Sequence, residues 1–211
     1  MIKEMKGDLL SVKKGYLAYE VSCTGFMIGG LAEQIKDKLL TEDQYEHYQV
    51  LCERNSADFL LGTLWGYYTN DADLIVAVMF AEDVRREEGR TTDYTSLKRC
   101  LDDLKLSVGI GHSSLSIPGY LGCGFGGGDW NYVFKYIITP LFKDFSNGLY
   151  IYYTHENVKR LWNDFNSVYI NPDTRCIEHE WHGFPKGTHR EEIWLWFERT
   201  FKLSVAEELN I

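Results

Sequence analysis

Hydrophobic and polar positions along the chain follow two alternating patterns. Short apolar runs typical of buried strands occupy residues 2–6, 17–22, 64–69, 74–80, 115–118 and 149–153. The run at 74–80 has no polar alternation, as expected of a strand covered on both faces. Between these runs, apolar residues recur at helical spacing over 31–39, 94–104 and 130–138. This rhythm predicts an α/β fold in which helices cover both faces of a sheet.

Two short motifs predict where helices begin. In the first, Thr41 can accept from the backbone of Gln44 while the Gln44 side chain reaches back, so a helix should run from here to about Cys52. The second motif is Thr-His-Arg-Glu at residues 188–191. It has the same pattern of a threonine followed three residues later by a glutamate or glutamine, and it predicts a capping box at the start of the last helix. That helix is too apolar to stand free in solvent.

The chain becomes denser in aromatic residues after residue 153. We expect residues 154–211 to form an extension that docks on residues 1–153 rather than a separate domain. Its aromatic side chains are expected to be core, with an exposed fraction that could form a homo-oligomer contact. Within it, residues 178–182 are expected to form a surface strand, with His179 and His182 on opposite faces, and no metal site.

Composition narrows the classes of partner. A formal charge of −9 argues against broad nucleic-acid binding, since phosphate neutralisation needs clustered Lys and Arg. Five cysteines without a CxxC pair indicate neither a disulfide framework nor a zinc ribbon. The first residues lack an apolar signal core, and no stretch is long enough to cross a bilayer. We expect a cytoplasmic protein with no membrane contact and no cofactor.

Two glycine-rich loops carry the chemistry. The first spans residues 22–30, and the second spans 122–128, where five of seven residues are glycine. Each lies between a predicted strand and a predicted helix. Glycines let backbone N–H groups approach an anion at a helix N-terminus, so two such loops could hold a diphosphate between them. Either loop alone could also be a tight turn.

With these loops the sequence resembles the macro domain family, and within it the ADP-ribose-1''-phosphate phosphatase-like branch found in phage and bacteria. The resemblance covers residues 1–153 through the segments 7–10, 17–32, 92–94 and 117–130. It implies a three-layer α/β/α domain with a mixed central sheet and ADP-ribose or an ADP-ribose-derived nucleotide as ligand. A phage-encoded member would work in the host cytoplasm.

The resemblance also implies roles for individual residues. Asp8 would accept from the adenine amino group and Leu9 would frame the base, although from the residues alone Asp8 is equally a turn or cap residue. The diphosphate and distal ribose would lie against Ser22, Cys23, Thr24, Gly25, Met27, Ile28, Gly29 and Gly30. The second loop would supply Gly122, Cys123, Gly124, Phe125, Gly126 and Gly127.

The sequence departs from the family pattern at Tyr19, Ile28 and Glu82, where members often carry His, Gly and Gln. Ile28 should disfavour a positive φ and obstruct the distal ribose pocket. The candidate catalytic residues are Glu82, Tyr19 and Asp129, although the position of Asp129 before an apolar helix favours a helix N-cap over catalysis. We interpret Glu20 as a solvated surface glutamate.

Three functions compete on these grounds. The leading hypothesis is hydrolysis of ADP-ribose-1''-phosphate or a similar substrate. The second is a non-catalytic binder of ADP-ribosylated protein or of an ADP-ribose-based signal, which the three departures favour. The third is a glycohydrolase, which is disfavoured because the Lys and Asp that a related branch uses near Glu82 and Gly126 are missing.

Overall fold

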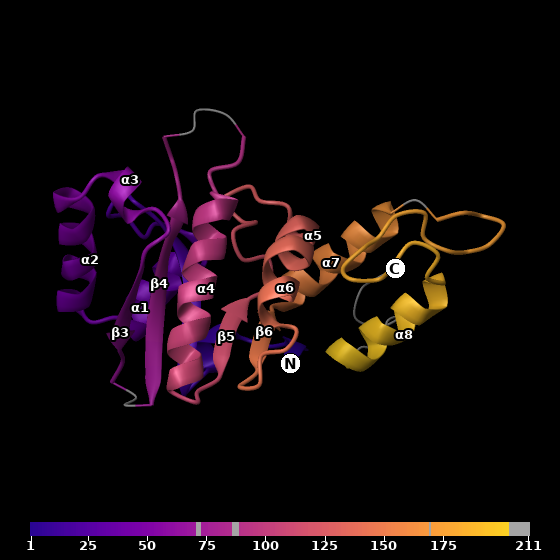
Figure 1. The fold of residues 1–211 in the computed structure, drawn as a ribbon, viewed down its shortest axis with the longest axis horizontal. Coiled ribbons are helices and arrows are strands. Elements are labelled where there is room, and N and C mark those ends of the chain that lie inside the picture. Colours follow the sequence, from indigo (N-terminus) through magenta and orange to yellow (C-terminus); the bar gives the residue numbers. More distant parts are fainter. Residues whose placement is uncertain (71–72, 86–88, 169, 203–211) are drawn as a thin grey trace.

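A computed structural model describes residues 1–70, 73–85, 89–168 and 170–202 of the chain (Figure 1). Its centre is one six-stranded sheet in the order β1-β6-β5-β2-β4-β3. The strands are β1 (Ile2–Lys6), β2 (Gly15–Ser22), β3 (Leu64–Tyr68), β4 (Leu74–Glu82), β5 (Leu115–Pro118) and β6 (Leu149–Tyr153). Only β3 runs antiparallel to its neighbour among these described strands. The sheet is therefore mixed, and the six predicted strands are confirmed.

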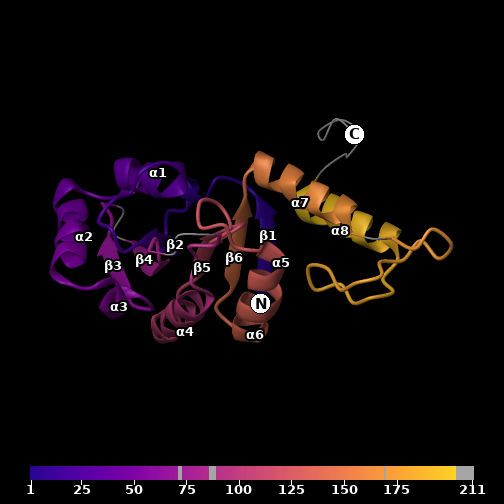
Figure 2. The same ribbon diagram turned by 90° about the horizontal axis from the view of Figure 1, so that it is seen from above.

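Helices cover both faces of this sheet. They are η1 (Leu9–Ser11), α1 (Gly30–Leu39), α2 (Glu42–Arg54), α3 (Ala57–Leu60), α4 (Tyr94–Ile110), α5 (Trp130–Tyr132), η2 (Val133–Ile138), α6 (Thr139–Phe142), α7 (His155–Ser167) and α8 (Arg190–Phe201). Figure 2 shows α1 and α7 on one side of the sheet and α4 and α6 on the other. The fold is thus a three-layer α/β/α arrangement. In the described part of the chain no helix is both long and apolar enough to span a membrane.

The two faces of the sheet bury different sets of side chains. Along β2, Leu17 and Tyr19 enter the core beneath α1 and α2, whereas Ala18 enters the core beneath α4. In β4, Val78 and Met79 divide in the same way. Successive side chains of a strand point to opposite faces, so a strand with both faces covered must be apolar at every position. This explains the unbroken apolar run at 74–80.

The helix-start motifs had different outcomes. At Thr41 both bonds of the capping box form, as expected: Gln44 N donates to Thr41 Oγ1 and Thr41 N donates to Gln44 Oε1. The second expectation is wrong, because α8 begins at Arg190 with His189 as its N-cap and without a side-chain cap bond. The Thr188 hydroxyl, one residue before this N-cap, donates to Pro185 O at 2.8 Å.

The predicted helix at 130–138 exists but changes its pitch. It begins as α5, widens to π-helix in η2 and returns to α-helix in α6. Pro140 follows directly, and it has no N–H to donate to the preceding turn. The Thr139 N–H accordingly reaches back five residues to Phe134 O. A π-bulge is a common response to a residue that interrupts the α-helical ladder.

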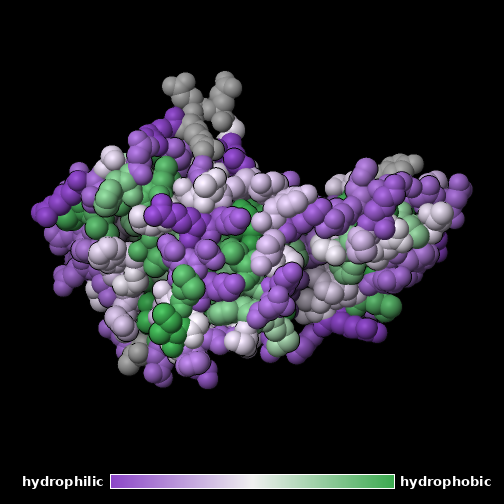
Figure 3. Space-filling model, viewed as in Figure 1, coloured by the Kyte–Doolittle hydropathy of each residue, from purple (hydrophilic) through white to green (hydrophobic). Residues whose placement is uncertain are grey.

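The aromatic extension projects from one end of the sheet, as Figures 1 and 3 show. Eight aromatic side chains pack there against one another: Trp162, Phe165, Trp181, Phe184, Trp194, Trp196, Phe197 and Phe201. Trp181 and Phe197 are buried, as expected of core residues. Residues 178–182 do not form the expected strand, because only the isolated bridge between Trp181 and Phe184 forms there.

His182 connects the extension to the first strand. Its Nε2 lies 2.8 Å from Oε2 of Glu4 in β1, and the same oxygen accepts from the Tyr153 hydroxyl at 2.7 Å. The His182 backbone N–H donates to the Asn131 side chain, and the ring stacks on Phe134 with 3.9 Å between centroids. His182 is buried, whereas His179 is exposed. The two histidines therefore differ in burial, and His182 belongs to the interior rather than to a surface strand.

Replacing His182 should destabilise the fold far more than replacing its exposed neighbour. In His182→Ala the Glu4 carboxylate stays buried without its imidazole partner, so the free energy of unfolding should fall by about 3 kcal/mol. The matched variant His179→Ala should stay within about 0.5 kcal/mol of the unaltered chain. Urea unfolding followed by tryptophan fluorescence would measure both. Equal stabilities for the two variants would contradict this role of His182.

Candidate functional site

The ends of five parallel strands meet at one edge of the sheet, and a pocket of about 850 Å³ opens there. Each strand delivers a lining residue at or just after its carboxyl end: Asp8 after β1, Ser22 from β2, Glu82 from β4, Pro118 from β5 and Thr154 after β6. A crevice outside the carboxyl ends of the strands is where open α/β sheets bind ligands. The volume is within the range of small-molecule sites.

Both glycine loops line this pocket, as the sequence predicted. Ten of the expected binding residues are among its walls: Asp8, Leu9, Ser22, Ile28, Gly29, Gly30, Gly122, Gly124, Phe125 and Gly126. Six others belong to the loops but do not line it: Cys23, Thr24, Gly25, Met27, Cys123 and Gly127. Sequence reasoning missed the walls contributed by Tyr120, Tyr152, Asn157 and Arg160. Nothing in their local sequence marks them, because they meet only in the folded chain.

The first glycine loop leads directly into α1. Gly29 and Gly30 have φ of 77° and 61°, a region in which side-chain-bearing residues are strained. Ile28 is not among the positive-φ residues, so the strain expected there is wrong, because the two glycines after it take the left-handed conformation instead. Its side chain is 75% exposed at the pocket rim. Gly29 is the N-cap of α1 and makes no side-chain cap bond.

The second glycine loop is held against the segment before α4. The backbone N–H groups of Thr91 and Thr92 both donate to Gly126 O at 3.0 Å, and the Thr92 hydroxyl lies 2.7 Å from Gly122 O. A β-carbon on Gly126 would overlap Thr92 Oγ1. The Phe125 ring extends across to Gly29 and Gly30 while remaining 82% exposed. Phe125 thus bridges the two loops.

Two glutamates face this pocket, and one differs from expectation. Glu20 is not a solvated surface residue: although the residue as a whole is only half-buried, its Oε1 atom has no contact with solvent and no hydrogen-bond partner among the described residues. Burial raises the pKa of the Glu20 carboxyl to about 8, and the nearby charge of Glu82 raises it further. Side-chain alternation places Glu20 on the Ala18 face of β2, beneath the second loop. Glu82 accepts from the Thr91 hydroxyl at 2.8 Å.

The other reactive groups near the pocket are suppressed by burial. Burial raises the pKa of the Tyr19 hydroxyl, which donates to Met27 Sδ at 3.3 Å. It also raises the pKa of the Cys123 thiol and brings that of Cys23 to about 12. A thiol attacks as its thiolate, so neither cysteine is suited to nucleophilic chemistry near neutral pH.

Helix α7 adds a cation to the pocket wall. The Arg160 guanidinium lies 4.2 Å from the ring centre of Tyr120, and its Nη1 donates to Cys123 O at 3.1 Å. Asn157, one turn earlier, donates to Gly119 O at 3.4 Å. The site therefore extends beyond residue 153, because the segment assigned to the extension supplies part of its wall.

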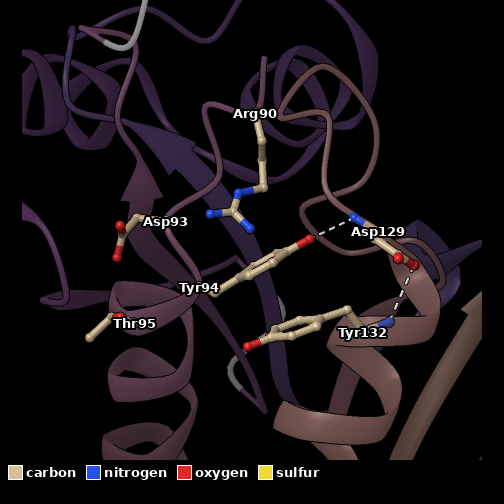
Figure 4. Close-up of a pocket in the computed structure, with 6 residues that line it drawn as sticks. All are labelled: Arg90, Asp93, Tyr94, Thr95, Asp129 and Tyr132. Carbon is tan, nitrogen blue, oxygen red and sulfur yellow. Dashed lines mark hydrogen bonds between the residues drawn. The ribbon is translucent and has the colours of Figure 1, made fainter. Parts of the chain in front are cut away.

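A second, smaller pocket of about 470 Å³ lies beside the end of the second loop (Figure 4). Arg90, Tyr94 and Tyr132 form a stack, with the guanidinium 3.6 Å from the Tyr94 ring centre and 4.5 Å between the two tyrosine centroids. Asp129 lines this pocket and caps α5, accepting from the N–H groups of Asn131 and Tyr132. The structure therefore does not bring Asp129 together with Glu82 and Tyr19.

Two Gly→Ala substitutions in the second loop test how closely that loop is packed. Their effects on the free energy of unfolding should differ, because only one of the two added methyl groups meets a neighbour. Gly126→Ala places a β-carbon against the buried Thr92 hydroxyl and should lower the free energy of unfolding by about 2 kcal/mol or more. Gly124→Ala meets nothing within 4 Å and should change stability by less than about 0.5 kcal/mol. Chemical denaturation of both variants is the measurement. A stable Gly126→Ala protein would show that the loop is not packed as described.

Comparison with known proteins identifies the fold through solved structures rather than through sequence. No protein-family model matches the sequence, and a search of curated proteins finds none with significant similarity. Solved structures do match. The macrodomain of Mycobacterium tuberculosis DarG is 24% identical with a TM-score of 0.60, covering 72% of this chain and 97% of that one.

Two further structures agree with it. The macrodomain of Thermus aquaticus DarG is 23% identical with a TM-score of 0.58, over 72% of this chain and 97% of that one. Thermosipho africanus DarTG, solved in complex with ADP-ribose, is 21% identical with a TM-score of 0.56, over 70% of this chain and 40% of that one. Together with the mixed sheet and its two helical layers, these matches show that the chain has the macrodomain fold.

Proposed function

We propose that this chain belongs to the macro domain family and binds ADP-ribose or a close derivative in the larger pocket. The observation that carries the proposal is the convergence of two glycine loops on one cavity at the carboxyl ends of five parallel strands. Loops from two parts of the sequence approach each other closely enough for Phe125 to touch Gly29 and Gly30. Such a cleft suits a diphosphate, which needs donors on two sides.

The start of α1 provides the donors. In the described helices α2, α4 and α7, an N-cap side chain accepts a hydrogen bond from a backbone N–H of the first turn. These N-cap residues are Thr41, Asp93 and Thr154. Helix α1 begins at Gly30 behind a glycine N-cap and makes no such bond. The N–H groups of its first turn and the positive end of its dipole are therefore left for an anionic ligand at the pocket wall.

The charged groups suggest an orientation for the ligand. Arg160 could pair with a phosphate, and Asp8 stands exposed at the end of β1, where the family resemblance assigns adenine recognition. One Asp8 oxygen accepts from Leu10 N at 2.9 Å, so Asp8 is a cap residue as well. The ADP-ribose bound to Thermosipho africanus DarTG supports the same class of ligand for a shared fold.

Binding without turnover fits the pocket best. Asp8 and Glu82 line it with Arg160, and added carboxylates oppose the charge of a phosphate ester. Tyr19 has a buried hydroxyl directed at Met27, and Asp129 lies in the other pocket. We therefore favour a binder of ADP-ribosylated protein or of an ADP-ribose-based signal.

Hydrolysis of ADP-ribose-1''-phosphate is the second candidate function. The observation that favours it is the position of Glu82, whose carboxylate lies in the pocket wall and is oriented by Thr91. A carboxylate so placed could take the proton of a water molecule that attacks the phosphorus. Loop N–H groups could stabilise the charge that develops.

Titration calorimetry with ADP-ribose should give saturable binding with one ligand per chain. A phosphate assay on the same sample with ADP-ribose-1''-phosphate should show no release if the protein is a binder. Release of phosphate that Glu82→Gln lowers by at least about tenfold would establish the phosphatase instead. If ADP-ribose gave no binding heat in the calorimeter, the proposed ligand would be contradicted.

Shortening Ile28 tests whether the rim restricts the pocket. Ile28→Gly should tighten ADP-ribose binding by about threefold to tenfold, because a branched side chain is removed from the expected ribose end. Ile28→Ala is the matched control, since it removes most of the side chain without adding backbone freedom. Calorimetric dissociation constants that are unchanged or weaker in both variants would contradict obstruction by Ile28.

A further inference from the structure

One buried hydroxyl contacts two acceptor oxygens, and one of them belongs to Glu20. Thr92 Oγ1 lies 2.7 Å from Gly122 O and 3.1 Å from Glu20 Oε2, and Thr92 has no solvent exposure. A threonine hydroxyl has a single proton. It cannot donate fully to a carbonyl oxygen and to a carboxylate oxygen at once. If Glu20 is ionised, the Thr92 proton serves either Glu20 Oε2, which leaves Gly122 O with Gly128 N as its donor, or Gly122 O, which leaves the carboxylate without this donor.

We propose that Glu20 carries a proton in the folded protein and is a positioning residue for the second glycine loop. Glu20 Oε2–H donates to Thr92 Oγ1, and the Thr92 hydroxyl then donates to Gly122 O. We call this chain of two hydrogen bonds the Glu20 relay. Each acceptor in it has its own donor. The relay adds to the bond from Gly128 N to the same Gly122 oxygen, so Gly122 O is held from two directions.

The surroundings of Glu20 agree with a neutral carboxyl. From β4, Glu82 faces it, and Asp93 at the start of α4 also acts on it, so both nearby charges are negative. The thiols of Cys100 and Cys123 are close enough for the charge of Glu20 to act on them, and burial keeps both thiols neutral. Among the described residues no cation acts on Glu20, and burial raises its pKa to about 8.

Ionising Glu20 would disturb the loop that lines the pocket. The carboxylate would compete with Gly122 O for the Thr92 proton, and a buried charge without a partner would draw in water. The loop 122–128 would then leave its closed packing against Thr91 and Thr92. This inference rests on the proposed function, since it makes ADP-ribose affinity depend on the protonation of Glu20 through the position of the second glycine loop.

Calorimetry of ADP-ribose binding at pH 6.5, 7.5, 8.5 and 9.5 tests the relay. The ligand's diphosphate has no group that titrates in this range. If only the protonated form binds, the dissociation constant should rise roughly 30-fold between pH 6.5 and 9.5. Glu20→Gln cannot ionise and can still donate to Thr92, so its affinity should be nearly independent of pH. Glu53→Gln, at an exposed position on α2, should keep the original dependence.

Variants at Thr92 separate the relay from a general effect of pH. Thr92→Val removes the shared hydroxyl and should weaken binding at pH 6.5 by about tenfold. Thr92→Ser keeps the hydroxyl and should restore it. The relay is excluded if the unaltered protein binds equally at pH 6.5 and 9.5, or if Glu20→Gln retains its pH dependence.

A measurement without ligand distinguishes failure of the relay from failure of the proposed function. The side-chain carboxyl carbon of Glu20, followed by nuclear magnetic resonance in ¹³C-labelled protein, reports its protonation directly. It should remain protonated at pH 7 and titrate near pH 8. An ionised Glu20 at pH 7 would overturn the relay even if ADP-ribose binds. A protonated Glu20 in a protein that does not bind ADP-ribose would support the relay and reject the ligand.

Discussion

The shape of the larger pocket depends on how closely the second glycine loop packs on Thr92. Thr92 is fully buried, its backbone N–H shares Gly126 O with that of Thr91, and its hydroxyl reaches Gly122 O. At this distance a side chain on Gly126 has no room. Glycine is therefore required here by close approach rather than by backbone conformation, because Gly126 is not among the residues with positive φ. From this contact follow the position of Phe125 and the width of the cleft toward the first loop.

The strands and loops could be predicted because their signals are local. A strand with both faces covered must be apolar throughout, so the run at 74–80 is recognisable without any knowledge of its neighbours. Glycine-rich loops between a strand and a helix are equally visible in sequence. The π-helical turn was not predicted, and α8 begins one residue later than the capping-box pattern indicated, with His189 as its N-cap.

The interior of the site could not be predicted because it depends on contacts between distant segments. Glu20 looks like a surface residue in a mainly apolar strand, and only the packing of the second loop and α4 on that face makes it buried. Arg160 is one of several charges on α7, and only the fold sets it against Tyr120. Glu82 ends β4 and lines the larger pocket, whereas Asp129 follows the second glycine loop and opens a helix beside the neighbouring pocket. Charge and spacing alone do not distinguish these outcomes.

Helix α7 contacts two parts of the molecule at once. One turn carries Asn157 and Arg160 to the pocket, and the next carries Trp162 and Phe165 into the aromatic cluster with Phe197. A ligand that contacts Arg160 and the part of the extension beyond α7 that packs on Trp162 therefore act on the same helix. Coupling between two equilibria is reciprocal, so any affinity that the docked extension adds for the ligand must return as an equal stabilisation of docking when the ligand is bound. The extension would then be a thermodynamic partner of the pocket rather than an appendage to it.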